Sequence, residues 1–176
     1  GDISDLRISY EIILVKGARN YHFEQVVSAL QHKTHLTIMQ VNLPALVYNF
    51  NYHRNLLRPD TKMVAMVKAS SYGLGDVELV NTLVDQGVDY LAVAYTDEGV
   101  RLRKRHINTP IIVLCAEAHS FEVMVNHHLE PEIFNFYYLQ QLEEVLERHP
   151  EIPQFNIHVK VDTGMHRLGF DLQDLP

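Results

Sequence analysis

His158-Val-Lys-Val-Asp162 is the stretch that decides the fold, because its polar and apolar side chains alternate. In an extended strand, successive side chains point to opposite faces, so His158, Lys160 and Asp162 would share one face. An open parallel sheet is covered by helices on both faces, where such a polar row would be costly. The inward face of a barrel can hold polar, ligand-facing groups near its mouth. The stretch therefore favours a barrel over an open sheet.

The strands that lead up to this stretch alternate with helices along the chain. Repeated strand–helix–strand units indicate a parallel sheet with right-handed crossovers. We predict an α/β fold that contains about five of the eight strands of a (β/α)8 barrel of the TIM type, in preference to an open flavodoxin-like sheet. The predicted strands are 62–68, 89–95, 110–115, 129–135 and 155–162, and the predicted helices are 43–57, 76–86, 97–106, 119–127 and 137–148.

Two of the predicted helices carry start signals. Asn42 precedes the first as its N-cap, and Pro44 lies in its first turn, where proline is tolerated. Thr96 is the predicted N-cap of the helix 97–106, with Asp97 and Glu98 in the first turn, where carboxylates interact favourably with the helix dipole.

The composition excludes several classes of protein. A formal net charge of −7 disfavours nucleic acid or an anionic membrane as a partner, and no apolar run approaches the roughly 20 residues that span a bilayer. A single cysteine, Cys115, allows no internal disulfide, which fits a reducing cytosol, and we predict a cytoplasmic protein. The eleven histidines lack the spacing of metal ligands, so we predict no metal site.

The first 35 residues differ from the rest. Their pattern predicts a strand at 8–15, a turn at 16–19 and an amphipathic helix at 22–31, which together are too small to fold alone. We therefore predict two parts, with residues 1–35 as the remnant of a preceding domain plus a linker and residues 36–176 as the partial barrel.

Two lysines stand where a predicted strand gives way to a glycine-containing loop. Lys68 follows the apolar run 63–67; an amine beside apolar walls loses hydration, which favours its neutral, nucleophilic form. Glycines 73 and 75 would let backbone N–H groups approach an anion. Lys160 shares a strand face with Asp162, and Arg167 lies just beyond. The alternative interpretations are a strand-end lysine paired with a carboxylate, and a buried ion-pair network around Lys160.

Three blocks of sequence resemble alanine racemase. They are Val41-Asn-Leu-Pro-Ala-Leu-Val-Tyr-Asn49, Lys68-Ala-Ser-Ser-Tyr-Gly-Leu-Gly75 and Lys160-Val-Asp-Thr-Gly-Met-His-Arg-Leu-Gly-Phe170, and the similarity runs from Leu36 to Pro176. The resemblance implies a fold-type III barrel that binds pyridoxal 5′-phosphate (PLP) and interconverts L- and D-alanine, which supplies peptidoglycan synthesis with D-alanine. It also implies a homodimer at full length.

The resemblance assigns roles to five residues. Lys68 would bind PLP as a Schiff base and act as the catalytic base on one face of the substrate, and Tyr72 would contact the PLP phosphate. Arg167 would bind the phenolic oxygen of the ring and contribute to the substrate site. Leu114 would line the ring, and Lys160 matches a lysine that is often carbamylated in this family.

The sequence also departs from the family. Leu74 stands where the family has histidine, which removes one hydrogen bond from that loop. The family's later strands, its C-terminal β domain and the tyrosine base for the other substrate face have no counterpart in the 176 residues. Racemisation needs acid–base groups on both faces, so we expect the chain alone not to racemise alanine efficiently.

The N-terminal part has a resemblance of its own. Ile13-Leu-Val-Lys-Gly-Ala-Arg19 and the helix after it resemble the end of the Mur-type ligase that adds D-alanyl-D-alanine to UDP-MurNAc-tripeptide. A ligase tail that runs into a racemase resembles the bifunctional ligase–racemase proteins of some bacteria. The alternative function for the barrel is a PLP-binding module without catalysis.

Overall fold

A computed structural model of the chain describes residues 27, 39–75 and 77–175. The chain divides into two units between Gln40 and Val41, and the elements that follow all belong to the second unit. The predicted strand 8–15 and turn 16–19 lie outside the described residues, as does the predicted helix 22–31 apart from Val27.

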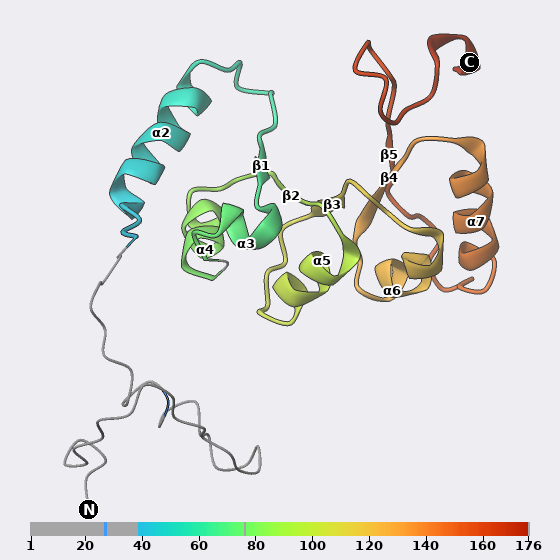
Figure 1. Ribbon diagram of the computed structural model, residues 1–176, viewed down its shortest axis with the longest axis horizontal. Coiled ribbons are helices and arrows are strands. Elements are labelled where there is room, and N and C mark those ends of the chain that lie inside the picture. Colours follow the sequence, from blue (N-terminus) through green and yellow to red (C-terminus); the bar gives the residue numbers. More distant parts are fainter. Residues whose placement is uncertain (1–26, 28–38, 76, 176) are drawn as a thin grey trace, which may run out of the picture. The chain divides into compact units, whose positions relative to one another are not determined.

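Five parallel strands form one sheet, and their order in space is their order along the chain (Figure 1). Each strand is thus added beside the one before it, as in a barrel, whereas a flavodoxin-like sheet would place its first strand between the second and third. The fold is therefore α/β and consistent with part of a TIM-type barrel, as predicted. The strands are β1 (Val64–Met66), β2 (Tyr90–Val93), β3 (Ile111–Val113), β4 (Glu130–Ile133) and β5 (His158–Val159).

The helices follow the strands as the sequence pattern predicts, with three differences. The predicted helix 119–127 is divided into a 3-10 turn, η3, and a short α-helix, α6. The turn α3 after β1 and the 3-10 turn η4 near the end of the described residues have no counterpart among the predicted helices. The helical elements are α2 (Leu43–Asn55), α3 (Lys68–Tyr72), α4 (Val77–Asp85), α5 (Thr96–Arg103), η3 (Ala118–Ser120), α6 (Phe121–Asn126), α7 (Phe136–Leu146) and η4 (Leu172–Asp174).

The hydrophobic core lies between one face of the sheet and the helices α4 to α7 (Figure 1). Strand β4 shows how the sheet divides its faces, because Pro131 and Ile133 are buried while Glu130 and Glu132 are only half-buried. Full burial of one aliphatic side chain contributes roughly 1.5–3 kcal/mol. The fully buried side chains include Val80, Leu91, Val93, Ile111, Val113, Phe121, Met124, Val125, Leu129, Ile133 and Leu142.

One predicted helix start is confirmed and the other is wrong. The side chain of Asn42 accepts a hydrogen bond of 3.0 Å from the Ala45 N–H, as an N-cap does. At α5, however, Tyr95 takes the cap position and Thr96 is already helical. The Thr96 hydroxyl is paired with the Ser120 hydroxyl at 2.8 Å, and the Glu98 carboxylate accepts the Tyr95 N–H instead, so the first turn of α5 is closed without a threonine cap.

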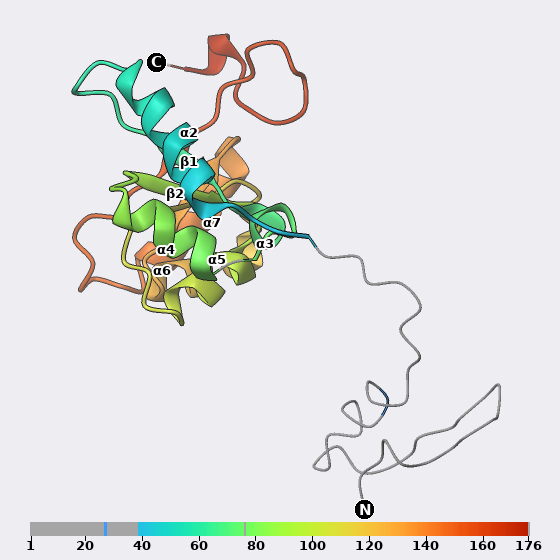
Figure 2. The same ribbon diagram turned by 90° about the vertical axis from the view of Figure 1, so that its left-hand side faces the viewer.

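Helix α2 packs against α4 (Figure 2). Arg54 donates a hydrogen bond of 2.6 Å to the carbonyl of Gly87 and lies 3.4 Å from the Asp89 carboxylate, which in turn accepts the N–H of Met63. These contacts attach the last turn of α2 to the segments that lead into β1 and β2.

Among the described residues, none of the helices combines the length and the apolar character that a membrane span requires. Among the same residues, no cluster of three or more histidine, cysteine, aspartate or glutamate side chains could hold a metal ion.

A histidine between two carboxylates connects α6 to the loop after α7. His149 Nε2 lies 2.6 Å from Glu122 and its Nδ1 lies 2.9 Å from Glu151, while Arg148 also pairs with Glu122 at 3.0 Å. Hydrogen bonds to Glu151 and Glu122 raise the pKa of His149 above its usual value of 6.5, and those to His149 and Arg148 lower the pKa of Glu122.

This cluster predicts how stability changes with pH. A raised folded-state pKa means that the His149 contribution is fully present below 6.5 and is lost as pH rises through the folded-state pKa. We expect His149→Gln to lower the chemical-denaturation midpoint most near about pH 6 and least near about pH 9. A pH-independent effect of His149→Gln would contradict the assignment.

Candidate functional site

The predicted site residues follow strand ends that meet at one edge of the sheet. Leu114 comes directly after β3, Lys160 directly after β5, and Lys68 two residues after the end of β1. Because the strands are parallel, their carboxyl ends lie at the same edge, where α/β proteins bind ligands. Tyr72 and Arg167 lie in the loops that follow β1 and β5.

Lys68 is half-buried, and in the described part of the chain its amine forms no ion pair. Its Nζ lies 6.0 Å from the ring centroid of Tyr72, whose side chain is exposed. Among the described residues, Lys68 is therefore not paired with a carboxylate, contrary to the alternative interpretation. An amine without a bound anion is open to reaction with a carbonyl carbon.

The backbone after Lys68 forms a left-handed turn. The φ angles of Ala69, Ser70, Ser71 and Tyr72 are 51°, 52°, 54° and 59°, a region that residues other than glycine seldom occupy. Each such residue costs roughly 1–2 kcal/mol, so four in succession need support from their surroundings. Strained backbone of this kind collects at functional sites, which makes this turn the most informative local feature of the structure.

The two glycines after the turn, Gly73 and Gly75, do not offer their backbone N–H groups to an anion, contrary to the prediction from the sequence. The N–H of Gly73 donates to the carbonyls of Ala69 and Ser70 at 2.9 and 3.1 Å, and the N–H of Gly75 donates to Ser70 at 3.0 Å. These donors are used within the turn and are not presented to an anion. Both glycines have positive φ angles, 81° and 102°, so their role is to end a left-handed segment.

The turn is held by a residue that the sequence reasoning assigned only to a helix end. The carboxylate of Glu98 accepts hydrogen bonds from the N–H groups of Ala69 at 2.6 Å, Ala94 at 2.8 Å and Tyr95 at 3.1 Å. A glutamate three residues after the cap position does signal a capping box, which accounts for the bond to Tyr95. The bond to Ala69 joins segments 29 residues apart, and no local pattern indicates it.

Lys160 is the most firmly bound of the predicted site residues. Its ammonium donates to both oxygens of Glu132 on β4, each at 3.1 Å, and the neighbouring pair His158–Glu130 is 2.7 Å apart. The side chains of Lys160 and Glu132 are 27% and 14% exposed, so this pair is only partly screened by solvent. The sequence reasoning missed Glu130 and Glu132, although Glu130-Pro-Glu-Ile133 alternates in the same way as β5.

The carboxylate of Asp162 is bound within the loop that follows β5. Its carboxylate accepts the N–H groups of Gly164 at 2.9 Å and His166 at 3.0 Å, and these backbone hydrogen bonds lower its pKa. It therefore shapes the loop that carries Arg167. Arg167 itself is exposed, and its guanidinium forms no hydrogen bond or ion pair with the described residues.

The loop after β5 closes back onto the strand through Phe170. The N–H of Phe170 donates to the carbonyl of Lys160 at 2.8 Å, and the N–H of Asp162 donates to the carbonyl of Phe170 at 3.0 Å. Gly169 makes this approach possible, because a Cβ atom there would lie 2.4 Å from the backbone nitrogen of Asp162.

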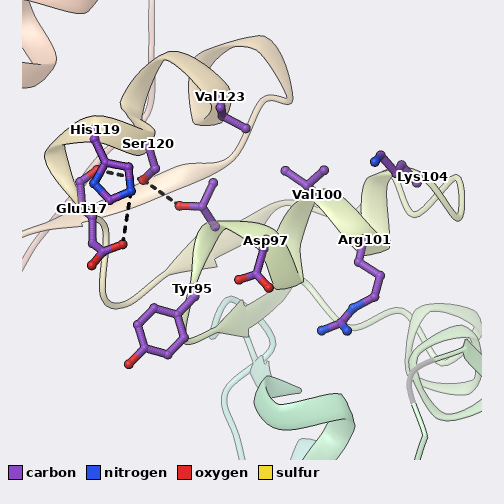
Figure 3. A pocket seen from close by; sticks show the side chains of 10 residues that line it. Tyr95, Asp97, Val100, Arg101, Lys104, Glu117, His119, Ser120 and Val123 are labelled. Atoms are coloured by element: carbon purple, nitrogen blue, oxygen red, sulfur yellow. Dashed lines mark hydrogen bonds and ion pairs between the residues drawn. The ribbon is translucent and has the colours of Figure 1, made fainter.

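A groove of about 660 Å³ lies beside the site but contains none of its predicted residues (Figure 3). Helix α5 supplies one wall and the 117–123 segment supplies the other. The Thr96–Ser120 hydrogen bond connects the two walls, and charged side chains of both signs line them. The lining residues are Tyr95, Thr96, Asp97, Val100, Arg101, Lys104, Glu117, His119, Ser120 and Val123.

Comparison with known proteins identifies the family of the second unit. Residues 41–176 match the family model described as alanine racemase, N-terminal domain. The alanine racemase of Clostridium kluyveri is 34% identical over 134 residues, which are 76% of this chain and 34% of that protein. The chain thus spans about a third of the length of the curated relatives that it matches.

Solved structures have the same fold. An alanine racemase of Clostridium difficile 630 superposes with a TM-score of 0.70 at 34% identity, over 77% of this chain and 37% of that one. An alanine racemase of Bartonella henselae, solved with covalently bound pyridoxal phosphate, gives a TM-score of 0.68 over 76% of this chain and 38% of that one. At 24% identity, the latter similarity shows the shared fold alone.

The close approach at Gly169 predicts a steric effect that can be separated from backbone strain. We expect Gly169→Ala to destabilise the loop by about 1–3 kcal/mol and to speed hydrogen exchange at the amides of Asp162 and Phe170. Gly164→Ala is the matched control, because Gly164 also has a positive φ but a Cβ there would meet nothing within 4 Å. Equal effects of the two substitutions would contradict the steric explanation.

Proposed function

This chain belongs to the alanine racemase family, and from that premise we propose that it carries the cofactor lysine of a PLP-dependent enzyme that interconverts L- and D-alanine. One observation carries the proposal: Lys68 follows β1 at the carboxyl edge of the sheet, half-buried and without an ion pair in the described part of the chain. Leu114 would line the cofactor ring from the end of β3.

The chemistry of the residues fits PLP at three points. Lys68 offers an amine for the aldehyde carbon of the cofactor, Tyr72 offers an exposed hydroxyl for its phosphate, and Arg167 offers an exposed cation for its phenolic oxygen. The N–H groups of Gly73 and Gly75 do not contribute, because both are bonded within the turn. Further phosphate contacts would have to come from other segments.

The proposed chemistry is proton transfer at the alanine Cα. PLP, when bound, withdraws electrons from that carbon and makes its proton acidic. The neutral amine of Lys68 would take this proton on one face of the substrate, and the ammonium so formed would return it. The guanidinium of Arg167 would hold the substrate or cofactor oxygen in place through charge-assisted hydrogen bonds. Interconversion needs a second proton-transfer group on the opposite face, and weak or absent turnover by the chain alone stays a prediction.

The carbamate that the resemblance implies at Lys160 would compete with the Glu132 pair. Lys160 is paired with the carboxylate of Glu132 at 3.1 Å, and carbamylation would break this pair and place a second anion beside Glu132. We therefore propose that Glu132 opposes the modification of Lys160 in this chain.

Several finer assignments are part of the proposal. We propose a homodimer at full length, a cytoplasmic location and a role in supplying D-alanine for peptidoglycan.

For residues 1–35 we propose the tail of a Mur-type ligase, on the resemblance of residues 13–19 alone. A longer gene product with a nucleotide-binding ligase domain before Gly1 would support that fusion, and a protein that begins near residue 1 would refute it.

Covalent trapping tests the cofactor assignment. After incubation with PLP and reduction with borohydride, we expect mass spectrometry to find the pyridoxyl group mainly on Lys68, at least tenfold above any other lysine. Lys68→Arg should abolish this labelling. Lys62→Arg is the matched control, because Lys62 is an exposed lysine before β1, and it should leave the labelling of Lys68 unchanged.

The outcomes of this trapping experiment separate the candidate functions. Scattered labelling would contradict a cofactor site at Lys68. Selective labelling together with no conversion of alanine, even in a full-length protein, would favour a PLP-binding module without catalysis.

The competition at Lys160 predicts the effect of removing Glu132. In bicarbonate buffer we expect Glu132→Gln to increase the fraction of Lys160 that carries carbon dioxide by about threefold or more, because an opposing charge is lost. NMR with isotope-labelled bicarbonate measures the adduct. Glu130→Gln removes the same charge from the same strand face but leaves the Lys160 pair intact, so it should have little effect. A fully carbamylated wild-type Lys160 would refute the competition.

A further inference from the structure

The left-handed turn after Lys68 requires an external support, and Glu98 is placed to give it. Four consecutive residues with positive φ begin at Ala69, so the peptide group between Lys68 and Ala69 marks the entrance to the strained segment. The N–H of that same peptide donates to Glu98 Oε1 at 2.6 Å. Glu98 thus contacts the backbone at the first possible position after the lysine.

The other oxygen of Glu98 joins the turn to the neighbouring strand. Oε2 accepts the N–H groups of Ala94 and Tyr95 at 2.8 and 3.1 Å, directly after β2 ends at Val93. β2 is paired in register with β1, and the N–H of Val67 donates to the carbonyl of Ala92 at 2.8 Å. One carboxylate therefore connects the turn that follows β1 to the residues that follow β2, directly beside Lys68.

We propose that Glu98 is a positioning residue for Lys68. It holds the left-handed turn in place and so sets the direction in which the side chain of Lys68 extends from the backbone. This positioning matters for catalysis only if Lys68 has the function proposed above. A lysine that must reach a fixed carbonyl carbon and later a proton on one face of a substrate tolerates little displacement.

Helix capping alone does not account for this arrangement. A capping glutamate needs only the N–H of the cap residue, here Tyr95, whereas Glu98 also binds Ala69 and Ala94. Three donors converge on one carboxylate, and a glutamine side chain has only one acceptor oxygen and places an NH2 group against at least one N–H. The substitution Glu98→Gln is therefore expected to disturb the turn with almost no change in side-chain size.

Asp97 provides a matched control on the same helix. It lies beside Glu98 in the first turn of α5 and is exposed, and its carboxylate accepts no hydrogen bond in the described part of the chain. Asp97→Asn removes the same charge from the same helix end but leaves the three contacts intact. Any general effect of charge on the stability of α5 should appear in both variants.

Two measurements on the whole chain test the proposal. The first is hydrogen exchange at the amides of Ala69, Ala94 and Tyr95, which we expect to be slow in the wild type and at least tenfold faster in Glu98→Gln, with Asp97→Asn within about twofold of the wild type. The second is the ratio of pyridoxyl labelling at Lys68 to that at Lys62, which we expect to fall about tenfold in Glu98→Gln and to remain unchanged in Asp97→Asn.

The outcomes distinguish this proposal from the proposed function. Fast exchange of the three amides in the wild type would overturn the positioning role without any variant. A folded Glu98→Gln with unchanged exchange and an unchanged labelling ratio would also overturn it, as would equal effects of Asp97→Asn. If Glu98→Gln fails to fold, Glu98→Asp, which keeps the charge but is one methylene shorter, should show the same changes to a smaller degree.

Loss of selective labelling already in the wild type would refute the cofactor role of Lys68. The exchange rates would then still decide whether Glu98 holds the turn.

Discussion

Parallel pairing of five strands in chain order brings all their carboxyl ends to one edge, and every feature of the site depends on that pairing. The strands are short, and the helices α4 to α7 stabilise the sheet by packing against one of its faces. Leu91, Ile111 and Ile133 are almost completely buried on that side. The lysines at the ends of β1 and β5 thus lie at the same edge although they are far apart along the chain.

The backbone after Lys68 shows how a strained segment can be kept in a stable fold. Within the turn, the N–H of Ser71 donates to the carbonyl of Val67 at 3.0 Å, and the N–H groups of Gly73 and Gly75 close the far end. The N–H of Ala69 has its partner outside, in the carboxylate of Glu98. The strain and its support therefore come from different elements, α3 and α5, and the geometry of the lysine depends on both.

The face of the sheet away from the helices is polar at β4 and β5. Two carboxylates of β4 pair with two basic side chains of β5, so charge is balanced locally. Because both pairs are partly buried, they matter mainly in that removal of one partner leaves the other charge uncompensated. The arrangement gives Lys160 a fixed partner, whereas Arg167, like Lys68, has no ion-pair partner among the described residues.

The sequence by itself determined the α/β class, the order of strands and helices, the cap at Asn42 and the position of both lysines at strand ends, because these follow from local periodicity and from residues close together in the chain. It also indicated the family, through three blocks of sequence. Only the tertiary structure decided the partners of those residues. The contacts Glu98–Ala69 and Glu132–Lys160 join segments 29 and 28 residues apart, and the strand register that creates them has no local signal. Thr96 was wrongly predicted as a cap for the same reason: Ser120, which binds its hydroxyl, is brought there by the fold and lies 24 residues away.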